Sequence, residues 1–401
     1  MNEPLRTPES LGAWPSEKTF SAAMRCGELL LVGSQVSLAT DGSVLHADDP
    51  GAQLAIVLRR VEAVLQSGQA DVSDLVRLLI YYVPAEGFDD DAIRRRIARW
   101  LDEPHRPVIT LVPVPWMAEP GLAVSIEGVA MPSMSRVRGV GAATGEFPQA
   151  IRCGRFIHVG AQMAMGTDGE VLHPGDIVRQ SEITMENLRQ VLDAHGASLD
   201  DAVKFNIYYV GEGTYEDWEV AARVRARYFR EPGPVATGIP VPALEKPGLL
   251  IKMEMWAMLG EDGSRLPREY SWPENHWDWA IHLPYKHGLL CDDMFFVGGQ
   301  IATDDQGTVL EPGDTEAQTD IALRYIDRVL EHLPGAERRH IAKTTTFYKG
   351  GSSAMEHARN LKPREAWFEP AAPVTSEVAL PALAYEDMMI EVEVLGRISH
   401  G

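Results

Sequence analysis

The sequence has few cysteines and none of the short motifs typical of metal sites. Its 401 residues include three cysteines, Cys26, Cys153 and Cys291. An odd number, spread along the whole chain, argues against a disulfide framework. Neither CxxC nor HExxH occurs, so the usual zinc signatures are missing. Each cysteine lies just before an apolar strand, where a small hydrophobe is favoured. We therefore expect buried packing rather than a three-thiolate site, and no metal.

Positive charge and long apolar runs are also scarce. Lys and Arg number 37 against 58 Asp and Glu, which gives a net charge of −21. Such a chain repels phosphate backbones and anionic lipids, so we expect neither nucleic acid nor membrane partners. No stretch approaches the ~20 apolar residues of a membrane span, and the N-terminus, MNEPLRTPES, has no apolar signal core. These features predict a globular, cytoplasmic protein.

One pattern occurs three times in the chain. Apolar strands end in GSQ, GAQ and GGQ at Gln35, Gln162 and Gln300, which are 127 and 138 residues apart. Each cysteine lies nine residues before its glutamine. Prolines that end the runs VPVP, IPVP and VALP repeat at the same spacing, as Pro115, Pro242 and Pro381. Self-similarity at a fixed period indicates tandem units. We place unit 1 at 1–133, unit 2 at 134–260 and unit 3 at 261–401.

Hydrophobic periodicity predicts the order ββαβαββ in each unit, an α/β (α+β) fold class. In unit 1 a strand at 28–38 and a short strand at 43–46 flank the turn Thr40-Asp41-Gly42. Apolar residues every three or four positions from 54 to 65 predict a helix that Gly68 ends. A strand at 75–83, a helix at 89–101 and strands at 108–114 and 123–131 complete the unit. The middle strand of each unit carries a basic residue (Arg77, Lys204, Lys343), expected to be a solvated cation.

An aromatic segment at 268–288 interrupts the repeat before unit 3. Three of the nine tryptophans fall within eight residues, at Trp272, Trp277 and Trp279. Ordinary linkers are rich in Gly, Ser or Pro, so this segment must pack against something. It either staples unit 3 to the other units or lines an apolar cavity. It also holds Tyr270, His276, His282, Tyr285 and His287.

The GSQ, GAQ and GGQ strands, the element order and the last strand of each unit together resemble the Rid (YjgF-like) family of reactive-intermediate deaminases. The resemblance covers nearly the whole chain as three tandem units. Family members are usually homotrimers with ligand sites in clefts between subunits. The resemblance therefore implies a pseudo-trimer around a pseudo-threefold axis with three non-identical clefts. It also implies hydrolysis of enamines and imines derived from amino acids, with no cofactor.

The resemblance implies three site groups. An Arg nine residues before the repeat Pro forks onto the substrate carboxylate. A Glu on the last strand orients or activates water. A Tyr fifteen residues before the repeat Gln closes the cleft from the neighbouring subunit. Each group survives once, as Arg106, Glu391 and Tyr285. Elsewhere the Arg is replaced by Gly233 and Ala372, the Glu by Ser125 and Lys252, and the Tyr by Phe20 and Phe147.

No cleft is expected to hold the complete family set. One cleft combines Arg106 with Tyr285 if unit 3 is the neighbour of unit 1 on that side. The alternative set, Glu391 with Phe20 or Phe147, lacks a cation for a carboxylate. We expect one partial site and two degenerate clefts.

Three functions remain open. The first is a cofactor-independent biosynthetic enzyme that acts on a reactive enamine, imine or enol and steers cyclisation, as chorismatase-like or alkaloid-pathway cyclases would. Its acid–base candidates are His282, Tyr285, His287 and Glu391, with Arg106 and His105 as anion or carbonyl binders. Its cleft would also be lined by Ser125, Trp277, Trp279, Phe20 and Phe147.

The second function is a 2-iminobutanoate/2-iminopropanoate-type deaminase that uses Arg106, and the third is a binding or scaffold protein without catalysis. Lys252 would form a Schiff base only if buried and is more readily explained as a solvated or ion-paired lysine. We expect a small-molecule substrate, and the aromatic segment points to an aromatic one. Because fusion already supplies the trimer interface, we also expect a monomer.

Overall fold

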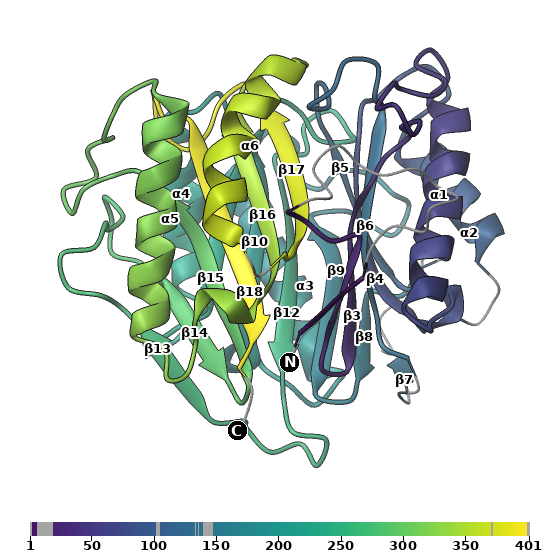
Figure 1. The fold of residues 1–401 in the computed structure, drawn as a ribbon. Coiled ribbons are helices and arrows are strands. Elements are labelled where there is room, and N and C mark those ends of the chain that lie inside the picture. The colour runs from purple at the N-terminus through teal and green to yellow at the C-terminus, as the bar shows by residue number, and fades with distance from the viewer. Residues whose placement is uncertain are drawn as a thin grey trace.

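The computed structural model describes residues 2–5, 19–101, 105–132, 134, 136–138, 147–369 and 372–398. They form an α+β structure of three six-stranded sheets, one per unit (Figure 1). The strand order is β1-β2-β3-β6-β4-β5 in unit 1, and the other two sheets repeat it. In Figure 1 the helices lie on the outside and the sheets face the middle of the molecule.

Unit 1 shows why its sequence forms these elements. Helix α1 starts where the Asp49 side chain accepts from the Ala52 amide, with Pro50 in the first turn, and ends at Gly68. Its buried stripe, Leu54, Val57, Leu58, Val61 and further residues, covers the sheet. The elements of unit 1 are β1 (Glu3–Leu5), β2 (Ala23–Cys26), β3 (Leu29–Gln35), α1 (Pro50–Ser67), η2 (Val72–Asp74), β4 (Leu75–Tyr82), α2 (Asp90–Trp100), β5 (Val108–Pro113) and β6 (Val124–Ala130).

Units 2 and 3 repeat this order. Unit 2 has β7 (Arg136–Arg138), β8 (Ala150–Cys153), β9 (Phe156–Met163), α3 (Ile177–Asp193), η3 (Leu199–Asp201), β10 (Ala202–Val210), α4 (Tyr215–Ala226), β11 (Val235–Val241) and β12 (Ile251–Met258). Unit 3 has β13 (Arg268–Ser271), β14 (Gly288–Cys291), β15 (Met294–Ile301), α5 (Thr315–Glu331), η4 (Arg338–His340), β16 (Ile341–Lys349), α6 (Ala354–Phe368), β17 (Val374–Leu380) and β18 (Ile390–Arg397). Among the described residues, no helix combines the length and the apolarity needed to cross a bilayer.

The first hairpin differs from the sequence prediction. It is formed by β2 and β3, which turn at Gly27 and Glu28. The predicted partner strand at 43–46 is reduced to one bridge between Leu38 and Val44. The turn at Gly27 has a positive φ of 63°, which glycine adopts without cost. The prediction was wrong because the Asp-Gly signal at 41–42 is the stronger sequence feature, although it closes only a loop.

The three sheets close into a ring. The edge strand of each unit lies against the bulged strand of the next: β5 against β9, β11 against β15 and β17 against β3. The glycines two residues before each repeat glutamine permit this approach. An added Cβ at Gly33 or Gly160 would lie 3.1 Å from Val374 or Val108 of the neighbouring unit, and one at Gly298 would lie 2.7 Å from the Ala236 carbonyl oxygen. The ring leaves three inter-unit clefts, named by the units they join.

An ion network occupies the pseudo-threefold axis, and the expectation of solvated cations was wrong. Arg77 and Lys343 are buried, and Lys204 is nearly so, because each faces a glutamate of the next unit. The repeated contacts are Arg77 with Glu254 at 2.6 Å, Lys204 with Glu393 at 2.5 Å and Lys343 with Glu127 at 2.9 Å. Arg77 also contacts Glu127 of its own unit at 3.2 Å. The nearby Lys343 and Arg77 lower the pKa of Glu127 to about 2, against the effect of burial.

The three cysteines are buried, as predicted. Cys26, Cys153 and Cys291 end β2, β8 and β14 and pack in one apolar cluster between the units. Burial raises the pKa of Cys26 to about 12 and that of Cys291 to about 11, so both remain neutral thiols.

Candidate functional site

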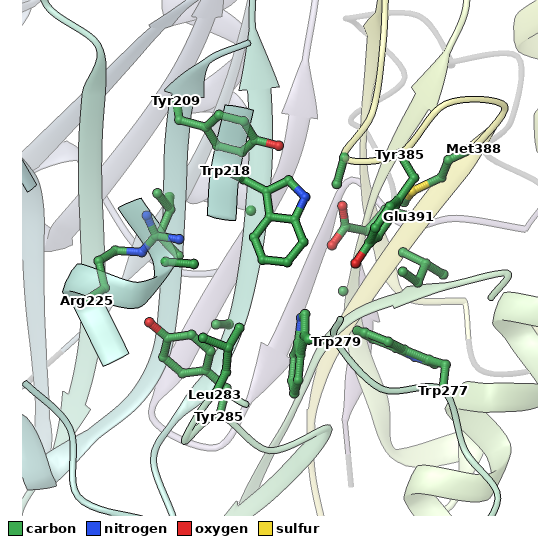
Figure 2. Close-up of a pocket in the computed structure, with 17 residues that line it drawn as sticks. Tyr209, Trp218, Arg225, Trp277, Trp279, Leu283, Tyr285, Tyr385, Met388 and Glu391 are labelled. Carbon is green, nitrogen blue, oxygen red and sulfur yellow. The ribbon is translucent and has the colours of Figure 1, made fainter. Parts of the chain in front are cut away.

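A cavity lies in the cleft between units 2 and 3, where β11 faces β15 (Figure 2). The empty space there, including its opening to solvent, is about 580 Å³. Six of its seventeen lining residues are aromatic, and a few polar groups lie among the rings. The side chains that line it include Tyr209, Trp218, Arg225, Trp277, Trp279, Leu283, Tyr285, Tyr385, Met388 and Glu391.

Arg225 supplies the positive charge of this cavity. It lies on α4 on the same face as Trp218, Ala221 and Ala222, at the 3-4 spacing of the apolar stripe. The side chain is buried, with 4% exposure, and its Nε and Nη1 have no hydrogen-bond partner among the described residues. Buried guanidinium groups are normally paired, because an uncompensated charge in the interior is costly. Arg225 is therefore suited to bind an anionic group of a ligand.

Further polar groups in the wall have few partners. The Tyr209 hydroxyl and the Trp218 indole N–H have none among the described residues, while the Tyr285 hydroxyl interacts with Arg225 and the Tyr385 hydroxyl with the Ala280 backbone. Burial raises the pKa of all three phenols, so each remains a neutral donor. Because most buried polar groups in folded proteins are hydrogen-bonded, this concentration indicates a site for a polar ligand or water.

Glu391 faces the cavity from β18, on the opposite side from Arg225 (Figure 2). Its carboxyl group lies directly over Gly299, where an added Cβ would come within 1.8 Å of Oε1. Burial, and then the negative charge of Glu393, raise the pKa of Glu391 to about 8, although Lys204 lowers it. A carboxyl group with a pKa near neutrality is suited to proton transfer in both directions.

The aromatic segment has both of the roles considered for it. It attaches unit 3 to unit 2, where the Gly233 amide donates to the Pro284 carbonyl at 2.7 Å, and it lines the cavity. The Gln300 side-chain oxygen accepts from His276 at 2.7 Å and from the Trp277 indole at 3.0 Å. Trp279 stacks on the ring of His287 with centroids 5.4 Å apart and planes 8° apart. These contacts hold two tryptophans against the cavity in fixed orientations.

The three family-like groups do not meet as expected. Arg106 lies over the Phe147 ring, 5.8 Å from its centroid, in the unit 1–unit 2 cleft. Tyr285 and Glu391 line the unit 2–unit 3 cleft instead. The expected combination of Arg106 with Tyr285 is therefore wrong, because unit 1 presents its Arg to unit 2 and not to unit 3. The expectation that Glu391 lies opposite Phe20 or Phe147 without a cation is also wrong.

The remaining predicted residues are distributed over the molecule. His282 is exposed and contacts Glu231 at 3.3 Å, so it lies outside the cavity. His287 is buried behind Trp279, and burial lowers its pKa well below the usual value, which keeps it neutral. His105 is exposed, and Phe20 packs on Phe368 with centroids 5.7 Å apart. Lys252 is fully buried but ion-paired to Glu245 at 2.7 Å.

Ser125 lines a cavity of about 430 Å³ in the unit 3–unit 1 cleft, where the charged side chains pair with one another. Arg364 lies 3.1 Å from Glu377, and His357 bridges Glu377 and Glu119, the latter at 3.0 Å. The two carboxylates raise the pKa of His357 to about 9, against the effect of burial. This cleft is electrostatically satisfied without a ligand, unlike the unit 2–unit 3 cleft.

Sequence reasoning missed Arg225, Trp218, Tyr209 and Tyr385. Arg225 carried a usable signal, because a charged residue on the apolar stripe of a helix must be paired or functional. The other three are aromatic residues at helix and strand positions, where core packing explains them equally well. Only the ring of units brings them to one cleft.

The fold is a pseudo-trimer of one α+β unit, with cavities in the clefts between units 2 and 3 and between units 3 and 1. The sequence pattern of the Endoribonuclease L-PSP family matches residues 12–132, 140–259 and 279–398. The chain therefore belongs to this family, as three tandem copies, and the resemblance to Rid (YjgF-like) proteins is confirmed.

Some similar proteins align with a single unit, and one solved structure aligns with most of the chain. A RutC family protein of Pyrococcus abyssi is 34% identical over 110 residues, 27% of this chain and 84% of the relative. A 2-iminobutanoate/2-iminopropanoate deaminase of Dermatophagoides farinae is 26% identical over 102 residues, 25% of this chain and 77% of the relative. A chorismatase crystal structure aligns with a TM-score of 0.56 and 15% identity over 81% of this chain and 93% of that chain, which shows a shared fold.

Proposed function

We propose that the unit 2–unit 3 cleft is the active site of a small-molecule enzyme in which Glu391 transfers protons to and from an enamine, imine or enol intermediate. The observation that carries this proposal is a carboxyl group with a pKa of about 8 that faces an aromatic cavity with unpartnered polar groups. The first candidate reaction is a cyclisation. Membership of the family and the mixture of aromatic and polar groups in the cavity wall support a small-molecule substrate.

The chemistry follows from the surroundings of Glu391. At neutral pH the carboxyl group is mostly protonated, so it donates its proton to the nucleophilic carbon of an enamine or enol. The carboxylate formed is disfavoured by burial and by Glu393. It therefore recovers a proton from another atom of the intermediate, which completes an isomerisation or ring closure. The phenol hydroxyls can donate to a developing oxyanion, and the tryptophan walls exclude water.

Imine hydrolysis is a second candidate. Glu391 occupies the position at which the family resemblance places the water-orienting Glu, and one relative is named as an imine deaminase. In this reaction Glu391 would direct a water molecule at the imine carbon and ammonia would leave. The missing family Arg, Gly233 in this cleft, favours the first candidate.

Two assays run side by side test the proposal. Exchange of the α-protons of phenylpyruvate in D₂O reports proton transfer on an enol, and ammonia release from 2-iminopropanoate and 2-iminobutanoate reports imine hydrolysis. We expect Glu391→Gln to lower the accelerated rate by about 100-fold or more, the usual contribution of a general acid–base group. Arg106→Ala, in the unit 1–unit 2 cleft, is the matched control and should change it less than about twofold, since that cleft has no part in the proposed reaction.

The outcomes are distinct. Loss of activity in Arg106→Ala with full activity in Glu391→Gln would move the active site to the unit 1–unit 2 cleft. No acceleration of either reaction by the wild-type chain would refute these catalytic roles and favour a binding protein.

A further inference from the structure

Two of the clefts have an arginine at the same repeat position, but the residues around it differ. Arg225 and Arg364 each lie seventeen residues before the repeat proline, on α4 and α6. Four residues before the same prolines, β11 has Gly238 and β17 has Glu377. The strand registers agree, because Gly238 pairs with Ile207 and Glu377 with Thr346, the residue equivalent to Ile207. The two clefts can therefore be compared atom by atom at this position.

In the unit 3–unit 1 cleft, the charge of the arginine is paired within the chain, although its Nη2 forms no hydrogen bond with the described residues. Arg364 Nη2 lies 3.1 Å from Glu377 Oε1, and its Nη1 donates to the Thr346 hydroxyl at 3.0 Å. Its Nε donates to the Asn360 side-chain oxygen at 3.0 Å. The guanidinium is fully buried. Its charge is neutralised by a carboxylate that β17 carries.

In the unit 2–unit 3 cleft, each of these partners is missing. Gly238 replaces the glutamate, Ile207 replaces the threonine and Ala221 replaces the asparagine. An added Cβ at Gly238 would meet only the Tyr209 ring within 4 Å, at 3.7 Å, so the space above this glycine is open. Gly238 and Arg225 both line the cavity. This cleft therefore has the buried arginine, Arg225, but no carboxylate at the position of Glu377.

We infer that the ligand of this cleft carries a carboxylate, which binds Arg225 in the space above Gly238 that the Glu377 side chain fills in the sister cleft. The aromatic or conjugated body of the ligand then lies between Trp218 and Trp279, with its reacting end toward Glu391. This inference rests on the proposed function for the choice of cleft. The subsite differs from the one the family resemblance implies, which corresponds here to Gly233.

A stability experiment tests the subsite without any ligand. Gly238→Glu rebuilds the internal carboxylate, and Gly238→Gln adds the same bulk without charge. In a chain that contains Arg225, we expect Gly238→Glu to melt at least about 2 °C above Gly238→Gln. Pairing the buried charge of Arg225 should raise the free energy of unfolding, and each kcal/mol of that free energy raises Tm by about 2 °C or more. In an Arg225→Met background the order should reverse. Equal melting of the two variants beside Arg225 would overturn the inference.

Binding of cinnamate and of its neutral isostere cinnamamide provides the second arm, measured by titration calorimetry. The wild-type chain should prefer cinnamate by at least tenfold, Arg225→Met should lose the preference, and Gly238→Glu should lose cinnamate binding. Binding of neither probe, or an equal affinity for both, would count against a carboxylate subsite.

The subsite and the catalytic proposal fail separately. Glu391→Gln should abolish turnover and keep the preference for cinnamate. If Glu391→Gln leaves turnover intact while the Arg225-dependent preference holds, the catalytic role falls and the subsite remains. If Glu391→Gln abolishes turnover but Arg225→Met keeps the preference for cinnamate, the subsite is refuted and the catalytic role remains.

Discussion

At the residue scale, the position before each repeat glutamine decides what its cleft can hold. Gly299 leaves the only room for the Glu391 carboxyl group, since a Cβ there would come within 1.8 Å of Oε1. In unit 1 the same position is Ser34, whose hydroxyl oxygen accepts from Ser125 at 3.0 Å. The residue before the glutamine and its partner on the last strand are therefore Gly299 with Glu391 in unit 3 and Ser34 with Ser125 in unit 1.

Gly299→Ala should displace the Glu391 carboxyl group and lower turnover by about tenfold or more, because small misplacements of a catalytic group are costly. Ala161→Gly, the equivalent site in unit 2, is the control and should leave turnover unchanged. The measurement is the steady-state rate of whichever reaction the wild type accelerates. Full activity of Gly299→Ala would show that the position of Glu391 is unimportant.

The raised pKa of Glu391 also predicts a pH dependence of stability. The folded-state pKa is about 8, above the ~4.3 of an unfolded glutamate. The folded protein keeps this proton until about pH 8, whereas the unfolded chain releases it above about pH 4. The stabilising contribution is therefore complete below about pH 4 and is lost as pH rises to about 8, so stability falls across this window. Glu391→Gln should remove this part of the decline, and wild type should lose at most a few kcal/mol relative to it. Urea unfolding of both chains from pH 5 to pH 9 measures the difference, and parallel curves would contradict the assignment.

Single residues also mark the limit of sequence reasoning about the site. Glu391, Tyr285, Trp277 and Trp279 were predicted and lie at one cavity. Arg225 was missed, and His282 was wrongly included, because neither burial nor the order of units around the axis can be read from residue types. Arg106 keeps the family position but faces a cleft that Lys252 and Glu245 already occupy with an ion pair.

At the element scale, the local signals predicted the fold well. In unit 1, helices α1 and α2 and strands β4, β5 and β6 lie close to their predicted positions. Those elements have one buried face or a continuous apolar run, which is the information that periodicity carries. The first hairpin failed because its strands are held by a long-range partner, β6, that no local pattern specifies.

Helix α6 differs from α4 in a way that yields a prediction. His357 occupies the place of Trp218 and ties α6 to Glu119 of unit 1. Its folded-state pKa is about 9, above the ~6.5 of a free histidine. The contribution to stability is complete below about pH 6.5 and lost as pH rises toward 9. In His357→Gln, the fall in unfolding free energy between pH 6.5 and pH 9 should be smaller than in wild type. The same urea series checks it, with an unchanged fall as the contrary result.

The aromatic segment allows a paired test of its two ends. Trp279→Ala should weaken ligand binding by about tenfold, since loss of a buried aromatic contact costs about 1–3 kcal/mol. His282→Ala should leave affinity within about twofold, because this exposed side chain contacts only the surface residue Glu231 among the described residues. Titration with cinnamate compares the two variants. A larger effect of His282→Ala would return this histidine to the site.

At the scale of the whole molecule, the axial ion network holds three different units to one geometry. Arg77 contacts Glu127 of its own unit and Glu254 of the next. Arg77→Met should destabilise the chain by about 3–5 kcal/mol, because it leaves buried carboxylates uncompensated. The double variant Arg77→Met/Glu254→Gln should recover part of the loss. Chemical unfolding measures both, and a cost below about 1 kcal/mol for the single variant would mean that the carboxylates find other partners.

The closure of the ring has a consequence for how the chain can be rearranged. Residues near the start meet residues near the end: the Ser21 amide donates to the Pro373 carbonyl at 3.1 Å, and Asn2 donates to the His340 carbonyl at 2.7 Å. The chain joins unit 1 to unit 2 and unit 2 to unit 3 covalently, whereas units 3 and 1 meet through noncovalent contacts such as these. A circular permutant that links unit 3 to unit 1 and opens the chain between units 1 and 2 should reach the same folded ring, with the unit 2–unit 3 cleft untouched.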